Sequence, residues 1–221
     1  MNYNNRFKDA PWYQKSKNEN IMIIGAGGIS SNTLYNLAKT IPARYHIIDF
    51  DTVEEYNVGC QFFRKSDVGK PKVNALQDLL QEFIPFRSTI YNLPYSSEMY
   101  YPIMITGLDN MKTRKEAFET WKSKNSRRLF IDGRMKANLY EVFAVVPGRE
   151  EEYEATLFDD SEVEEGPCTF KQTSYVGMMI GSRITQIVVN YLINYYAEEN
   201  ICEVPFHVKE LTEAFYYDCK N

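Results

Sequence analysis

A glycine-rich turn and an aspartate further along the chain are the residues best suited to chemistry. The apolar residues 21–24 run directly into Gly25-Ala26-Gly27-Gly28, and Asp49 closes a second apolar run at 45–48. Glycines let a phosphate approach the backbone where a helix begins, and an acid after the next strand can accept hydrogen bonds from ribose hydroxyls. The pattern therefore favours a nucleotide site formed by these turn residues and Asp49.

NAD is the default nucleotide for such a unit, because Asp49 lies where a ribose-binding acid belongs. The third glycine of the dinucleotide-binding pattern is Ser30 in this chain, which loosens the contact between helix and strand without removing the site. Similar turns also occur in α/β proteins that bind no ligand. The residues after Asp49 are needed to decide which nucleotide is bound.

Three further motifs follow in order along the chain. They are Asp49-x-Asp51-x-Val53 with Asn57 and Gln61, then Gly69-Lys70-Pro71-Lys72, then Asp109-Asn110 with Arg114. This ordered set resembles the ThiF/MoeB/HesA family, the adenylating domain shared with ubiquitin-activating enzymes. The resemblance covers residues 21–147, with a looser echo at 167–192.

The resemblance implies ATP-dependent activation of a carboxylate, usually the C-terminal glycine of a ubiquitin-like or sulfur-carrier protein. The carboxylate attacks the α-phosphate of ATP, pyrophosphate departs, and an acyl adenylate remains. Three phosphates and a carboxylate bring many negative charges together, so cations must neutralise them. The resemblance thus implies ATP and Mg²⁺ as cofactors.

The resemblance also assigns roles to individual side chains. Asp49 takes the ribose hydroxyls, Asp51 and Asn57 belong to the nucleotide site, Lys72 grips the phosphates, and Asp109 holds Mg²⁺, a hard ion that prefers oxygen ligands. Each has a plainer alternative. Lys72 could be a solvated lysine where a helix begins, Asp109 a helix N-cap, and Asn57 a turn former.

One departure from the family pattern concerns a catalytic cation. The motif arginine, which stabilises charge on the transferring phosphates, is replaced by Cys60. Arg64, four residues on, can take its place; otherwise Arg64 is a surface residue and the enzyme is slow or degenerate. Family members also receive an arginine from a partner subunit, for which Arg6 is a candidate. Arg114 is expected to be structural and to pair with an acid near the sheet edge.

Cys168 is the candidate nucleophile for a second step. It lies in Gly166-Pro167-Cys168-Thr169, between an acidic stretch and a long helix, which resembles the region where family cysteines accept the acyl group. A helix N-terminus lowers the pKa of a nearby thiol and so activates it. The alternative is a small packed residue. Cys60 is expected to be a filler, and His46, inside a strand, a satisfied core residue.

The apolar pattern predicts an α/β fold, a Rossmann-like and mostly parallel sheet with helices on both faces. Strands are expected at 21–24, 45–50, 88–92, 103–106 and 128–131, and helices at 29–41, 73–80, 110–122 and 173–197. An added antiparallel strand is expected at 138–146. Residues 149–165 hold nine acidic residues against one arginine, which predicts a mobile loop.

We interpret residues 1–221 as a single domain with an N-terminal arm (1–19), an acidic crossover loop (149–167) and a tail (200–221) that shows no clear pattern. The net charge of −5 argues against nucleic-acid binding. No apolar run approaches the roughly 20 residues of a membrane span, and the polar start is no signal peptide, so we expect a cytoplasmic protein.

Four scattered cysteines without a C-x-x-C pair argue against a zinc site. Tyr191, Tyr195 and Tyr196 on the last helix, together with the resemblance, favour a homodimer. Two other functions stay open. The chain could be a degenerate family member that binds nucleotide or a partner without catalysis, or an NAD-dependent oxidoreductase.

Overall fold

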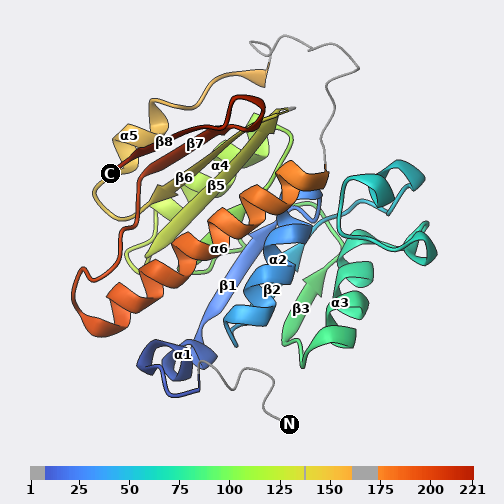
Figure 1. Cartoon of the computed structure of the whole chain (residues 1–221), viewed down its shortest axis with the longest axis horizontal. Helices are drawn as coiled ribbons and strands as arrows, with labels where there is room; N and C mark the ends of the chain where they lie inside the picture. Colours follow the sequence, from blue (N-terminus) through green and yellow to red (C-terminus); the bar gives the residue numbers. More distant parts are fainter. Residues whose placement is uncertain (1–7, 137, 161–173) are drawn as a thin grey trace.

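One eight-stranded sheet runs through the molecule. The computed structural model describes residues 8–136, 138–160 and 174–221, and its strands lie in the order β3-β2-β1-β4-β5-β6-β7-β8 (Figure 1). Strands β1 to β5 are parallel, and β6, β7 and β8 are antiparallel. The strands are β1 (Asn20–Ile24), β2 (Arg44–Ile48), β3 (Ser88–Tyr91), β4 (Ile103–Thr106), β5 (Leu129–Lys136), β6 (Leu139–Val145), β7 (His207–Leu211) and β8 (Tyr216–Lys220). The predicted fold class is confirmed.

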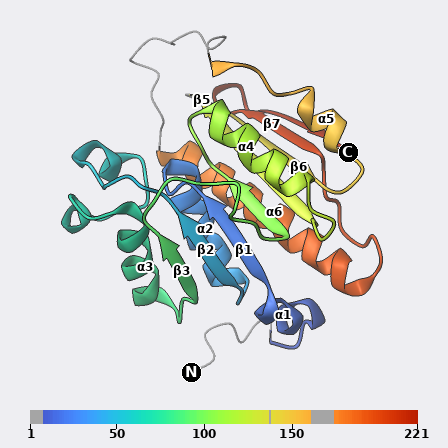
Figure 2. The same ribbon diagram turned by 180° about the vertical axis from the view of Figure 1, so that it is seen from behind.

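Helices cover both faces of the sheet (Figures 1 and 2). One face carries α2 (Gly28–Thr40), α3 (Lys72–Phe83) and α6 (Ser174–Ala197), and the other carries α4 (Met111–Lys122) and α5 (Glu150–Glu154). The short α1 (Pro11–Lys15) packs against α6. Single 3₁₀ turns lie at Ser16–Asn18, Glu55–Gly59, Lys65–Asp67 and Thr212–Ala214. Each face of the sheet therefore has its own hydrophobic core.

Helix α6 packs unusually closely on α2 through two of its glycines. A Cβ atom on Gly181 would lie 2.8 Å from the backbone nitrogen of Thr33, and one on Gly177 would lie 3.1 Å from the carbonyl oxygen of Gly28. The helices approach this closely because the glycines leave room for backbone. The packing holds the beginning of α2 firmly against the sheet.

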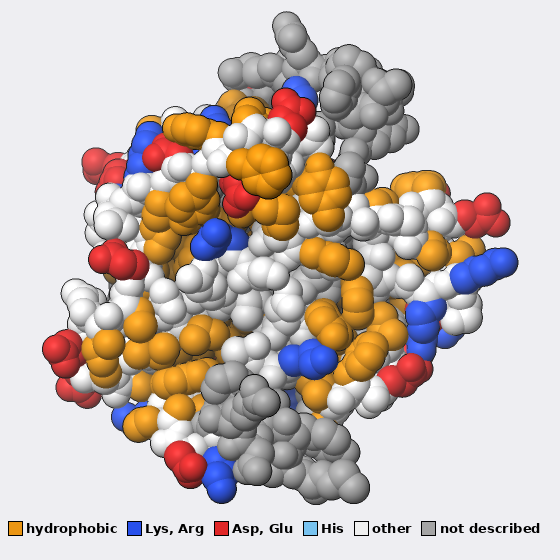
Figure 3. Space-filling view, in the orientation of Figure 1, with side chains coloured by type: hydrophobic (Ala, Val, Ile, Leu, Met, Phe, Trp, Pro, Cys, Tyr) orange, Lys and Arg blue, Asp and Glu red, His pale blue; other side chains and the backbone are white. Residues whose placement is uncertain are grey.

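By length and composition alone, α6 is apolar enough to cross a membrane, and half of its most apolar stretch is buried inside the protein. The expectation that no segment of the chain is long and apolar enough to span a membrane is therefore wrong for α6. Its buried residues belong to the core that α6 shares with α2 and one face of the sheet, which explains the apolarity. Figure 3 shows this face, where basic and acidic side chains are interspersed among hydrophobic ones.

Several boundaries differ from the predicted ones. Strand β5 does not end at residue 131 but continues to Lys136, because it pairs with β6 from Phe130 onward. Strand β2 ends at Ile48, so that Asp49 and Phe50 lie beyond the sheet. The unassigned tail forms β7 and β8, whose antiparallel pairing extends the sheet.

The loop predicted at 149–165 is wrong for its first part, which forms α5. Tyr153 of this helix is fully buried against Phe118 and Phe130. Basic side chains neutralise the acids around it: Arg127 pairs with Glu150 at 2.8 Å, and Lys122 pairs with Glu154. The acidic composition indicated a loop because these basic partners come from distant parts of the chain. Residues 161–165 lie outside the described residues.

His46 on β2 is buried, as predicted, but only half of its ring is satisfied. Its Nε2 lies 3.0 Å from Oδ1 of Asn20, whereas Nδ1 has no partner among the described residues. The ring stacks on Tyr101 with centroids 3.9 Å apart. Burial, together with a smaller effect of the nearby Arg44, lowers the pKa of His46 to about 4.

We expect Gly181→Ala to destabilise the protein. Alanine would normally favour a helix by about 0.5–1 kcal/mol over glycine. Here the new methyl group would meet the backbone of α2, and overpacking of this kind costs about 1–3 kcal/mol. Urea unfolding would measure the change, with Ser182→Ala on the exposed side of α6 as the control, expected within about 0.5 kcal/mol. Equal or higher stability of Gly181→Ala would contradict the close packing.

We expect the protein to lose stability as the pH falls from 6.5 to 4. In this range the unfolded chain protonates His46, whose ordinary pKa is 6.5, while the folded protein resists until about pH 4. The loss attributable to His46 amounts to as much as about 3 kcal/mol. Unfolding of the wild type and His46→Gln at several pH values would measure it. The same slope in both proteins would rule out this role of His46.

Candidate functional site

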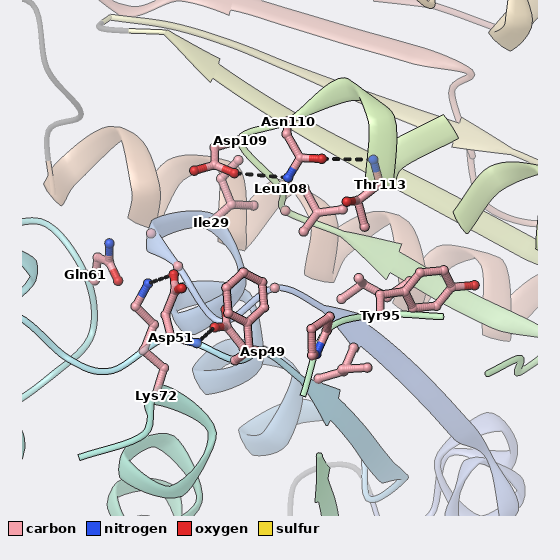
Figure 4. A pocket seen from close by; sticks show the side chains of 18 of the residues that line it. Ile29, Asp49, Asp51, Gln61, Lys72, Tyr95, Leu108, Asp109, Asn110 and Thr113 are labelled. Carbon is pink, nitrogen blue, oxygen red and sulfur yellow. Dashed lines mark hydrogen bonds and ion pairs between the residues drawn. The ribbon is translucent and has the colours of Figure 1, made fainter. Parts of the chain in front are cut away.

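A pocket of about 350 Å³ opens at the carboxyl ends of β1, β2 and β4 (Figure 4). Strand order reverses between β1 and β4, and ligands of open α/β sheets bind at such a switch point. The described residues that line the pocket are Ile24, Gly25, Gly27, Gly28, Ile29, Ile48, Asp49, Phe50, Asp51, Gln61, Lys72, Leu93, Pro94, Tyr95, Gly107, Leu108, Asp109, Asn110, Thr113 and Met135. The glycine turn, Lys72 and Asp109, far apart in the sequence, thus share one hollow.

The turn between β1 and α2 presents bare backbone to the pocket. Gly25 has a φ of +89°, which other residues rarely adopt, and a Cβ there would lie 3.0 Å from the carbonyl oxygen of Gly107. Gly27, the N-cap of α2, faces open space, since a Cβ on it would meet nothing within 4 Å. The backbone amides of the first turn of α2 are therefore open to a ligand. A helix N-terminus favours a negatively charged one.

Asp49 is held at the end of β2 by two backbone hydrogen bonds. Its Oδ2 accepts from the amide of Ala26 at 2.6 Å, and its Oδ1 accepts from the amide of Asp51 at 2.7 Å. Burial raises the pKa of Asp49, while these hydrogen bonds oppose the rise. The carboxylate is thereby fixed beside the glycine turn, where the ribose-binding acid is predicted.

Lys72 enters the pocket from the first residue of α3. Its Nζ lies 2.7 Å from Oδ2 of Asp51, and only a tenth of its side chain is exposed. The backbone ties the same segments together, because the Lys72 amide donates to the Asp51 carbonyl at 2.9 Å and Thr52 bridges to Pro71. Lys72 is therefore a positioned cation rather than a solvated lysine.

Asp109 lies across the pocket, after β4, and is exposed. It is not the N-cap of α4. That role belongs to Asn110, whose Oδ1 accepts from the amide of Thr113 at 2.9 Å. Among the described residues, the Asp109 carboxylate accepts one long hydrogen bond, 3.4 Å from the side-chain Nδ2 of Asn110, so its oxygens remain available to a ligand.

The site fits a magnesium ion that arrives with a triphosphate. In the part of the chain that the structure describes, no three acidic, histidine or cysteine side chains gather as a metal cage. Mg²⁺ does not need one, because it is commonly held by one or two carboxylates together with substrate phosphates and water. Three carboxylates, Asp49, Asp51 and Asp109, face a single lysine among the described lining residues, which favours a cation.

Two features of the pocket were not predicted. Gln61 lines it, and its buried Oε1 has no partner among the described residues. The family motif included Gln61, but no role was assigned to it. At the other end of the pocket, Phe50, Leu93 and Tyr95 form an apolar wall suited to a flat base. The loops after β2 and β3 supply this wall. No local sequence pattern predicts that these two loops lie next to each other.

Two predicted residues lie outside the pocket lining. Asn57 is buried, and its Oδ1 accepts from the Glu54 amide at 2.9 Å, as a turn former does. Arg64 pairs with Asp67 at 2.9 Å and also with Glu82. A catalytic role of Arg64 stays a prediction that would require these ion pairs to break.

Cys60, Cys202 and Cys219 lie within the described residues, and of these Cys60 is the one near the nucleotide motifs. Burial raises the pKa of its thiol, and Sγ faces the carbonyl oxygen of Tyr56, so it suits a filler rather than a nucleophile. Cys168 and Arg6 lie outside the described residues. Arg114 has the predicted structural role: its Nε donates to the buried Asp132 at 2.6 Å.

A profile of the ThiF family matches residues 2–220. The chain belongs to the ThiF family. Among curated relatives, the SUMO-activating enzyme subunit uba-2 of Caenorhabditis elegans is 29% identical over 170 residues, which cover 73% of this chain and 29% of that protein. The NEDD8-activating enzyme E1 catalytic subunit of the same organism is 33% identical over 119 residues, 48% of this chain and 28% of that protein. The ThiF-family chain thus spans less than a third of these relatives.

Solved structures share its fold. The crystal structure of E. coli MccB with ATP matches with a TM-score of 0.73 and 16% identity, over 96% of this chain and 66% of MccB. The structure of PaaA matches with a TM-score of 0.74 and 17% identity, over 96% and 66%. At this identity the likeness concerns the fold alone.

We expect Ser30 and Gly107 to be energetically coupled. Ser30 Oγ is buried without a partner among the described residues, so Ser30→Ala should leave stability unchanged or raise it by up to about 1 kcal/mol. A Cβ on Gly107 would collide with this oxygen, so Gly107→Ala should cost about 1–3 kcal/mol. The double variant should recover at least about 1 kcal/mol of that loss. Urea unfolding of all four proteins gives the coupling, and strict additivity would refute it.

Proposed function

We propose that this chain uses Mg·ATP to adenylate a carboxylate, the C-terminal glycine of a ubiquitin-like or sulfur-carrier protein. The observation that carries the proposal is the convergence of Lys72 and Asp109 on the pocket of the glycine turn. They come from the beginning of α3 and the end of β4, on opposite sides of the pocket. Membership of the ThiF family and similarity to SUMO- and NEDD8-activating enzymes support the same reaction class.

The pocket suggests how ATP would lie. The base would contact the apolar wall of Phe50, Leu93 and Tyr95, and the ribose hydroxyls would donate to Asp49. The triphosphate would then cross the open N-terminus of α2, where backbone amides and the helix dipole favour negative charge. In this orientation the phosphates would lie between Lys72 and Asp109.

In the proposed reaction a carboxylate oxygen attacks the α-phosphorus, the bond to the β-phosphate oxygen breaks, and pyrophosphate leaves. Lys72 would transfer its ion pair from Asp51 to the phosphates and stabilise their charge in the transition state. Asp109 would hold Mg²⁺, which when bound supplies further positive charge to the phosphates. Gln61 can donate a hydrogen bond from its amide to the same region.

The protein or peptide that would be adenylated is proposed from the reaction class of the relatives and not from a contact in the structure. The curated relatives act, by name, in SUMO and NEDD8 activation, which favours a ubiquitin-like tail. The absence of a C-x-x-C pair from the sequence makes a zinc-bearing sulfur-carrier enzyme less favoured. A short peptide precursor is the remaining carboxylate class. A homodimer, and transfer of the acyl group to Cys168, also belong to the proposal and are testable by sedimentation and by thioester trapping.

We expect Lys72→Met to weaken catalysis far more than Lys70→Met. Lys70 lies two residues away but pairs with Asp67, outside the pocket lining, so it is a matched control for the loss of a lysine. Loss of one charge-stabilising group costs about 10²- to 10³-fold in rate. The measurement is exchange of labelled pyrophosphate into ATP in the presence of Gly-Gly-ended carrier proteins and peptides, alongside calorimetric binding of Mg·ATP and of NAD.

The alternatives give different results. Binding of Mg·ATP without pyrophosphate exchange against any carboxylate would identify a degenerate, non-catalytic member. Binding of NAD in preference to ATP would identify an oxidoreductase and overturn the proposal. Equal exchange rates for Lys72→Met and Lys70→Met would remove Lys72 from the mechanism.

A further inference from the structure

A fully buried carboxylate, Asp132 on β5, lies behind the pocket wall and takes no part in lining it. It accepts four hydrogen bonds: from Arg114 Nε at 2.6 Å, from Arg134 Nε at 2.7 Å, and at 3.0 Å from each of the hydroxyls of Tyr153 and Thr106. A buried carboxylate needs such partners, because the removal of a positively charged partner leaves its own charge uncompensated. Asp132 is therefore a fixed point to which several segments are tied.

One arm of this network holds the loop that carries Asp109. Arg114, on α4, reaches back and donates from Nη2 to the carbonyl oxygen of Leu108 at 2.6 Å. Because the same guanidinium is bound to Asp132, the residue immediately before Asp109 cannot shift without disturbing the buried charge.

The other arm holds the chain that follows α5. Arg134 donates to the carbonyl oxygen of Thr156 at 2.9 Å and to its hydroxyl at 3.0 Å. Its guanidinium also lies over the rings of Phe143 and Phe158, at 4.4 and 5.8 Å from the centroids. The segment that leads to Asp160 is thereby anchored to the same carboxylate as the Asp109 loop.

Asp160 joins the two arms. Its Oδ1 accepts from the amide of Met111 at 2.7 Å, and its Oδ2 accepts from the amide of Lys112 at 3.2 Å. With Asn110 bound to the amide of Thr113, three amides of the first turn of α4 are occupied by side chains of this chain. The N-terminus of α4 is thus closed by an acid from a segment 48 residues away, whereas that of α2 is open.

We infer that Asp160 is a positioning residue for the cation of the proposed nucleotide site, with Asp132 as its buried anchor. The inference rests on the proposed function, in which Asp109 holds Mg²⁺. Asp160 touches neither ATP nor the metal in this scheme. It fixes the first turn of α4, and with it the backbone from which the Asp109 carboxylate extends. Groups that orient a metal ligand commonly control metal affinity strongly.

The test uses Asp160, because it is exposed and its loss should leave the core intact, whereas a change at the buried Asp132 would endanger folding. Asp160→Ala removes both acceptors, and Asp160→Asn keeps one. Glu151→Ala is the matched control, an exposed acid on α5 in the same stretch of chain. Calorimetric titration of Mg²⁺ at fixed ATP measures assembly of the site without requiring catalysis.

We expect Asp160→Ala to raise the half-saturating Mg²⁺ concentration by about tenfold, with Asp160→Asn intermediate and Glu151→Ala within about twofold of the wild type. In pyrophosphate exchange, the rate at saturating Mg²⁺ should stay within about twofold, because the residue positions the ligand and does not act on the reacting atoms. Hydrogen exchange should accelerate at the amides of Met111 and Lys112.

The outcomes separate this inference from the proposed function. A wild type that exchanges pyrophosphate, with Asp160→Ala showing unchanged Mg²⁺ dependence, overturns the inference and leaves the proposed function standing. If the wild type binds Mg·ATP but does not exchange pyrophosphate, the proposed reaction is overturned. The calorimetric comparison of wild type and Asp160→Ala still tests whether Asp160 positions the magnesium ligand. A wild type that binds no Mg·ATP removes the proposed function and the inference together.

Discussion

The contact between two bare turns, at Gly25 and Gly107, is the constraint on which the site depends. They follow the adjacent strands β1 and β4, and a Cβ on Gly25 would press against the carbonyl oxygen of Gly107. Because neither Gly25 nor Gly107 carries a side chain, the two crossovers that leave in opposite directions can begin close to each other. Lys72 reaches the hollow from one side and Asp109 from the other, and neither would face a common ligand if these turns stood further apart.

Charge then decides what this hollow can accept. Its described lining holds more carboxylates than cations, so an anionic ligand gains little unless it brings positive charge with it. The backbone compensates in part, since the α2 terminus is left open while that of α4 is closed by Asp160 and Asn110. A negatively charged ligand can therefore bind at the N-terminus of α2, whereas the N-terminus of α4 is occupied by side chains of the protein itself.

Much of the fold and the centre of the site could be predicted from the sequence, because they depend on local patterns. Alternating apolar runs indicated the parallel sheet, and ordered motifs placed the glycine turn, Asp49, Lys72 and Asp109 together. The failures share a cause. Helix α5 looked like a loop because its basic partners lie far away in the chain, and Asp132 and Asp160 act through hydrogen bonds to α4. The nucleotide role of Asn57 stays a prediction, and its side-chain oxygen accepts a hydrogen bond within a turn.

The packing of α6 on α2 also has a consequence for how the chain is made. The two helices are separated by more than a hundred residues along the chain, and α6 packs against α2 on the same face of the sheet. During synthesis α2 therefore lacks this packing partner until residues 174–197 have left the ribosome. Contacts between segments so far apart in a chain form slowly, and apolar surface that stays uncovered in the meantime promotes aggregation.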